Sequence, residues 1–74
     1  MKLFNLLDVI DYEQNMKVLI ENNGMIEAEV SGDQASIIKM LSSKMLEADV
    51  SCIAARDGKV IWVWLEEDAT DENA

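Results

Sequence analysis

The sequence predicts an α+β two-layer sandwich with the element order α-β-β-α-β-β, in which a four-stranded antiparallel sheet carries two helices on one face. Apolar residues recur at helical spacing in two segments, and they alternate with period two in four others, arranged in pairs around a glycine turn signal. The 74-residue chain is half hydrophobic and has no proline, which is typical of a globular chain. We expect a single domain over residues 1–65 and a disordered acidic tail over residues 66–74.

Residues 2–11 form the first predicted helix, because their large apolar side chains fall on one stripe. These side chains are Leu3, Leu6, Leu7 and Ile10. A polar loop over residues 11–15 follows, and it interrupts the helical period.

Period-two alternation then predicts a hairpin around Asn22-Asn23-Gly24, with Val18 and Ile20 on its apolar face. A two-residue turn at Asn23-Gly24 would set Ile20 opposite Glu27 and mix the two faces. A three-residue loop with a bulge at Gly24 sets Ile20 opposite Ile26, so the pattern favours the longer loop. The other face is largely charged, with Lys17, Glu21, Glu27 and Glu29.

The second predicted helix spans residues 33–47, and either Ser31 or Asp33 suits its N-cap. Its apolar stripe consists of Ile37, Ile38, Leu41 and Met45. Lys44 lies near the end of the helix, where the helix dipole favours a positive charge.

Residues 50–65 form a second predicted hairpin, with Asp57-Gly58 as a two-residue type I′ turn. This register opposes Ala54 to Ile61, Cys52 to Val63 and Val50 to Leu65, which makes one face wholly apolar. The reverse face carries Ser51, Ile53, Ala55, Val60, Trp62 and Trp64.

The two tryptophans are the most informative feature of the sequence. If the helices cover the first face of this hairpin, the indoles stand on the open face as an apolar patch, and such a patch usually marks an interface. The expected interface residues are Ile53, Val60, Trp62 and Trp64. A symmetric dimer through this face is then the simplest outcome. In the alternative interpretation the faces are reversed, and the tryptophans belong to the core beneath the helices.

The net charge of −9 argues against direct binding of nucleic acids or of anionic membranes, since both require lysine and arginine. It suits solubility, or a basic partner protein. The expected acidic surface comprises Glu21, Glu27, Glu29, Glu66, Glu67 and Asp68. These carboxylates would either imitate the phosphates of DNA in a basic groove or simply form the solvent side of the sheet.

The sequence predicts no catalytic, cofactor or metal site. Histidine is absent, and Cys52 is the single cysteine, which in an apolar stretch is expected to be a small buried hydrophobe rather than a nucleophile. Glu27 and Glu29 would be exposed, so they would make poor general acids. The chain contains neither a long apolar segment nor a signal-peptide pattern, from which we expect a cytoplasmic protein.

In style, the chain resembles the short acidic proteins of phages and prophages of low-GC Gram-positive bacteria. The shared features are the Leu3-Phe4-Asn5-Leu6-Leu7 opening, the Lys-Val-Leu-Ile strand that leads into Asn-Asn-Gly, and the acid-rich end. Some of these proteins, the anti-CRISPR proteins, inhibit Cas nucleases by presenting acids where the enzyme expects DNA.

Two functional hypotheses follow from the sequence. The first is a non-enzymatic protein-interaction module that acts, and could self-associate, through the Trp62/Trp64 face. The alternative, which the resemblance implies, is a phage-type inhibitor of a nucleic-acid enzyme that acts by acidic DNA mimicry.

Overall fold

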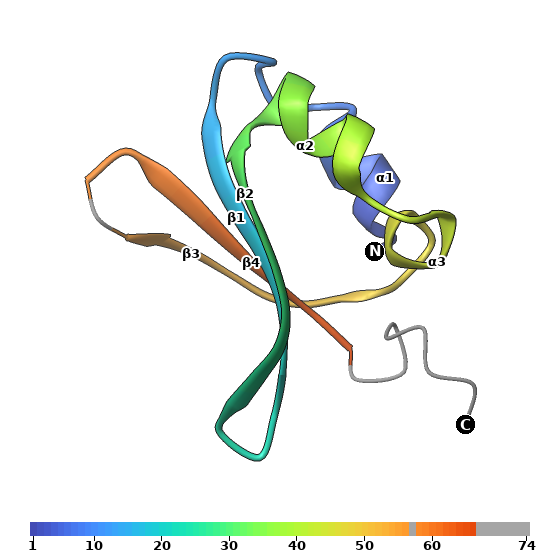
Figure 1. Cartoon of the computed structure of the whole chain (residues 1–74). Helices are drawn as coiled ribbons and strands as arrows, with labels where there is room; N and C mark the ends of the chain where they lie inside the picture. The colour runs from blue at the N-terminus through green and yellow to red at the C-terminus, as the bar shows by residue number, and fades with distance from the viewer. Residues whose placement is uncertain (57, 67–74) are drawn as a thin grey trace.

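The computed structural model describes residues 1–56 and 58–66 of the chain. This part forms an α+β fold with three helices and one four-stranded sheet (Figure 1). In chain order, the elements are α1 (Leu3–Leu7), β1 (Asn15–Asn22), β2 (Met25–Asp33), α2 (Gln34–Met40), α3 (Ser43–Leu46), β3 (Val50–Arg56) and β4 (Val60–Leu65). The tail expected over residues 66–74 lies outside the described residues, except for Glu66.

The sheet is mixed, with the strand order β2-β1-β4-β3. Both hairpins are antiparallel, but β1 and β4 run parallel, with Val18 beside Val63 and Ile20 beside Leu65. The prediction of a wholly antiparallel sheet is therefore wrong at this junction. The physical reason is the path of the chain: β2 ends level with the start of β1, and β3 begins level with the end of β1. Residues 34–49 therefore cross the length of the sheet, and β4 then runs in the same direction as β1.

The helices pack on one face of the sheet, and Figure 1 shows them gathered on one side of the twisted strands. The buried core between the two layers consists of Leu3, Leu6, Leu7, Met16, Val18, Ile20, Ile37, Leu41, Ala48, Val63 and Leu65. Two helices were expected, and three are present because the segment predicted as one helix over 33–47 divides at Leu41. The Leu41 backbone is extended (φ −83°, ψ 143°), and the Ser42 side chain then begins α3 by accepting a hydrogen bond from the Met45 N–H.

The first helix is also shorter than the predicted span of residues 2–11, because α1 ends at Leu7. Ile10 still packs against the core as a half-buried side chain, so the predicted stripe remains on the inner side. Gln34 is buried at the start of α2, and its Nε2 donates a hydrogen bond of 2.8 Å to the Leu7 carbonyl oxygen. The same oxygen also accepts a hydrogen bond of 3.3 Å from the Ile10 N–H, so Gln34 links the turn that follows α1 to the start of α2.

Asp33 is the N-cap of α2, which confirms one of the two predicted caps. Its Oδ1 accepts a hydrogen bond of 2.8 Å from the Ser36 N–H. Hydrogen bonds from Ser36 stabilise the charged carboxylate and hold the pKa of Asp33 below its ordinary value.

The first hairpin uses the two-residue turn that the pattern disfavoured. Asn22 pairs with Met25, and both Asn23 (φ 54°) and Gly24 (φ 82°) adopt positive φ, as a type I′ turn requires. A register shift between Ile20 and Glu21 then sets Ile20 opposite Ala28 and Val18 opposite Val30. Beyond this shift, apolar side chains of the two strands lie opposite each other. The predicted pair of Ile20 with Ile26 is therefore wrong, because the bulge lies inside the strands rather than at Gly24.

The second hairpin is offset by one residue from the predicted register. Arg56 pairs with Val60, so three residues separate the strands instead of the two of the predicted Asp57-Gly58 turn, and Asp57 lies outside the described residues. Ile53 consequently pairs with Val63. A register shift between Val50 and Cys52 cancels the offset, so Val50 lies opposite Leu65 as predicted.

Candidate functional site

The candidate site is the face of the sheet that the helices leave uncovered, and β4 provides its centre. Val63 and Leu65 point into the helix-side core, so the alternating Trp62 and Trp64 occupy the opposite face. Val60 shares their face by the same alternation. We call this surface the indole face and define it by Lys17, Leu19, Glu21, Arg56, Val60, Trp62 and Trp64.

Ile53 does not belong to the indole face, although the sequence predicted it there. Its pairing with Val63 places it on the helix side of β3, because residues opposite each other in a sheet share a face. The helices do not extend over this edge strand, and Ile53 remains 47% exposed. The one-residue offset of the second hairpin places Cys52 and Ala54 on the indole face instead, opposite Trp64 and Trp62.

The two indoles are in contact and are partly covered by cations. Their ring centroids lie 5.8 Å apart with the planes tilted by 39°. The Lys17 Nζ lies 4.4 Å from the Trp62 ring centroid, and the Arg56 Cζ lies 5.2 Å from the Trp62 ring and 5.0 Å from the Trp64 ring. Both tryptophans are therefore half-buried, rather than exposed as expected, and the face combines apolar rings with positive charge.

Leu19 forms the floor of the indole face. It is 1% exposed, yet it does not belong to the core beneath the helices. The parallel pairing sets it beside Trp64, and Lys17 lies beside Trp62. Alternation along β1 puts Leu19 on the same, largely charged side as Lys17 and Glu21. A large aliphatic residue between Lys17 and Glu21 was the available signal that this side has a small core of its own.

The two indole N–H groups differ. The Trp64 Nε1 donates a hydrogen bond of 3.0 Å to Glu21 Oε1, whereas the Trp62 Nε1 is buried and has no partner among the described residues. An unsatisfied buried donor costs about 1–3 kcal/mol, so packing and the nearby cations must offset this cost. Packing therefore holds the Trp62 ring in place, whereas a hydrogen bond to Glu21 also fixes the Trp64 ring.

Three carboxylates of the expected acidic surface, all in the first hairpin, contact nearby side chains. Besides the bond from Trp64 to Glu21, the Glu29 carboxylate lies 3.3 Å from Lys17 Nζ, and Glu27 accepts a hydrogen bond of 3.0 Å from Asn22 Nδ2. Glu66 follows β4 and is exposed, whereas the predicted residues Glu67 and Asp68 lie outside the described residues. The carboxylates of the first hairpin thus belong to the side-chain network of the sheet.

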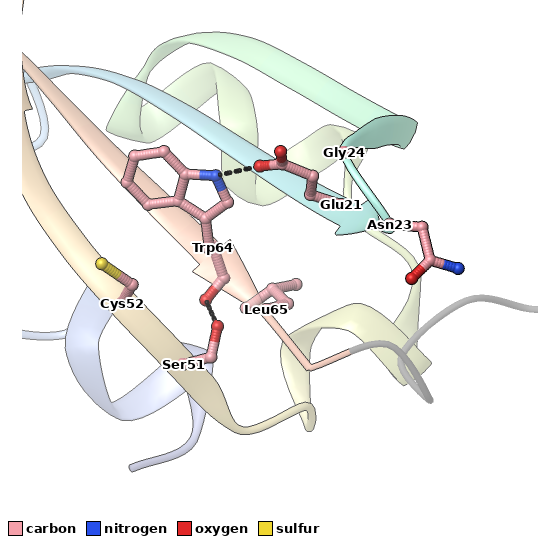
Figure 2. Close-up of a pocket in the computed structure, with 7 residues that line it drawn as sticks. All are labelled: Glu21, Asn23, Gly24, Ser51, Cys52, Trp64 and Leu65. Carbon is pink, nitrogen blue, oxygen red and sulfur yellow. Dashed lines mark hydrogen bonds between the residues drawn. The ribbon is translucent and has the colours of Figure 1, made fainter.

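A shallow pocket of about 390 Å³ opens where the parallel strands β1 and β4 end (Figure 2). Its lining residues are Glu21, Asn23, Gly24, Ser51, Cys52, Trp64 and Leu65. Figure 2 shows the bond from Trp64 to Glu21 on one side and the bond from Ser51 Oγ to the Trp64 carbonyl oxygen on the other. The pocket therefore continues the indole face toward the β1–β2 turn.

Cys52 is exposed at this pocket, which corrects the expectation of a small buried hydrophobe; the cause is the position of β3 at the edge of the sheet. Across residues 1–56 and 58–66, no three histidine, cysteine or acidic side chains form a group that could hold a metal ion. Within the same residues, every helix is too short or too polar to cross a membrane. No protein-family model, curated protein or solved structure matches the chain.

Proposed function

We propose that the protein is a non-enzymatic protein-binding module and that the indole face is its binding surface. The observation that carries this proposal is the pair of half-buried tryptophans on the sheet face opposite the helices, surrounded by Lys17, Arg56 and Glu21. Binding surfaces commonly have an aromatic centre and a polar rim, and tryptophan and arginine are the side chains most enriched at hot spots.

The chemistry of the face indicates how a partner would bind. A partner side chain that displaces Arg56 would gain contact with both rings, because the guanidinium carbon lies about equally far from each of them. The rigid rings lose little conformational entropy on binding, whereas Lys17 and Arg56 can rearrange to meet a carboxylate or a carbonyl group.

The test is affinity capture from extracts of the source organism, with charge reversal on the indole face compared with charge reversal elsewhere. Arg56→Glu should abolish capture of a partner that the parent protein retains. Lys44→Glu, a reversal at another exposed position on α3, should leave capture unchanged. Far-UV circular dichroism checks that both variants fold. A partner that binds Arg56→Glu and the parent equally well would contradict the indole-face proposal.

The alternative proposal is inhibition of a nucleic-acid enzyme by acidic mimicry, and it is supported by the exposed Glu21 and Glu29 beside the indoles. The two functions differ in their response to salt and to charge reversal. A mimic should lose affinity steeply as salt rises and should bind a basic groove more tightly after Arg56→Glu. A partner held by the indoles should retain its affinity in salt and lose it after the same substitution.

A further inference from the structure

The pocket beside Trp64 is acidic. Among the described residues that line it, Glu21 is the only one that carries a charge at neutral pH. All six lysine and arginine side chains of the sequence belong to the described part of the chain, and none of them forms an ion pair with Glu21 there. The nearby Lys17 ammonium pairs with Glu29 instead. The pocket therefore presents a negative charge that no cation of this chain neutralises by direct contact.

The Trp64 indole positions the Glu21 carboxylate. Glu21 Oε1 accepts the 3.0 Å hydrogen bond from Trp64 Nε1, and Oε2 accepts no hydrogen bond from a described residue. A carboxylate has lone pairs for several donors, so the bond to the indole leaves room for a further donor. Because the Trp64 side chain is half-buried, this bond also restricts the motion of an exposed carboxylate. Glu21 is thus oriented for a ligand before the ligand binds.

Trp64 provides the aromatic wall of the pocket. The Arg56 guanidinium carbon lies 5.0 Å from the centroid of the Trp64 ring, which shows that a planar cation can approach this indole. Arg56 itself does not line the pocket. The part of the indole that faces the pocket, beside the Glu21 carboxylate, is therefore open to a second cation.

We propose that this pocket binds an arginine side chain of a basic partner protein. The guanidinium pairs with the Glu21 carboxylate and lies against the Trp64 indole. The volume of about 390 Å³ is at the lower end of the range for ligand pockets, about 300–1,000 Å³, and suits one side chain. The net charge of −9 attracts a basic partner. This inference rests on the proposed function, because the pocket continues the indole face, and it adds the chemistry of the partner.

The pocket suits arginine better than lysine because its acceptors lie on different sides. Glu21 lies on one side of Trp64 and Ser51 on the other, and the Asn23 amide completes the lining near Glu21 (Figure 2). The Ser51 hydroxyl donates to the Trp64 carbonyl oxygen, so its own oxygen can accept a hydrogen bond. A guanidinium has five N–H donors in one plane and can lie against a ring while it donates in several directions. An ammonium is a compact point charge without a flat face.

Nuclear magnetic resonance titration of the full chain with a blocked arginine, N-acetyl-arginine N-methylamide, tests the proposal. The indole N–H signal of Trp64 and the amide signal of Gly24 should shift, with a dissociation constant in the millimolar range. The indole N–H signal of Trp62, which does not line the pocket, should stay in place. Blocked citrulline, which has nearly the same shape without the charge, should cause no shift, and blocked lysine should bind more weakly. Absence of a shift with arginine, or equal binding of arginine and either control probe, would overturn the proposal.

Two variants with the same net charge separate the pocket from general electrostatic attraction. Glu21→Gln keeps an oxygen for the Trp64 N–H but removes the charge, and it should weaken binding of the arginine probe about tenfold. Glu27→Gln is the matched control, since Glu27 is exposed on the same hairpin and does not line the pocket, and it should bind the probe like the parent. Equal weakening in the two variants would contradict a site at Glu21.

The titration and the capture experiment on Arg56→Glu can fail separately. A parent protein that captures its partner through the indole face but does not bind the arginine probe would overturn this inference alone. A parent that binds the probe, but whose partner is retained after Arg56→Glu, would overturn the proposed role of the indole face and leave the pocket assigned.

Discussion

Leu19→Ala tests whether the indole face has a small apolar core of its own. The Leu19 side chain is 1% exposed, and its burial comes from the indole face rather than from the helices. Full burial of a leucine side chain contributes about 1.5–3 kcal/mol, and truncation to alanine adds the cost of the cavity that remains. Because the half-buried indoles can relax into part of that space, we expect a loss of about 2–3 kcal/mol in the free energy of unfolding.

Urea unfolding, followed by circular dichroism and tryptophan fluorescence, measures this loss. With a slope of about 1 kcal/mol per molar, usual for a small domain, the midpoint should fall by about 2–3 M. Ile53→Ala provides the control, because Ile53 is 47% exposed and its truncation should cost less than about 1 kcal/mol. If the two variants unfold at the same urea concentration, Leu19 is not packed beneath the indoles.

Two further predictions concern the start of α2. Gln34→Ala removes the hydrogen bond from Gln34 Nε2 to the Leu7 carbonyl oxygen, which keeps its bond from the Ile10 N–H, and should destabilise the protein by about 0.5–1.5 kcal/mol in the same urea assay; an unchanged midpoint would show that the Gln34 bond does not stabilise the fold. Asp33 has a lowered pKa in the folded state, so its contribution to stability is present above its ordinary pKa of 3.8 and is lost as the pH falls through the lower folded value. The thermal midpoint of the parent should therefore fall relative to that of Asp33→Asn below this pH, and a difference that stays constant from neutral pH to strong acid would contradict the cap.

Much of the local structure could be predicted from the sequence, because local signals determine it. The alternation around Gly24 and Gly58 predicts both hairpins, and the cap at Asp33 is confirmed. The division at Leu41 was missed because the apolar stripe continues through it, and only Ser42 and Ser43 suggest a new helix start.

The order and direction of the strands depend on contacts between segments that are distant in the sequence. The local pattern of residues does not predict these contacts. The parallel pairing of β1 with β4 sets Lys17 beside Trp62 and Leu19 beside Trp64, and no local period specifies that neighbour. A one-residue change in the second turn moved Ile53 to the other face, because side chains in a strand alternate. The tryptophans could be predicted as the centre of a candidate site, but the cations and the leucine around them could not.

Nuclear Overhauser contacts of the two indoles give the most direct test of where the tryptophans lie. Because Leu19 lies beneath the indoles, we predict cross-peaks from the ring protons of Trp62 and Trp64 to the methyl groups of Leu19, with upfield shifts of those methyls from the rings above them. Cross-peaks from the rings to the helix side chains Leu7 and Ile37 would contradict it, because they would place the indoles beneath the helices.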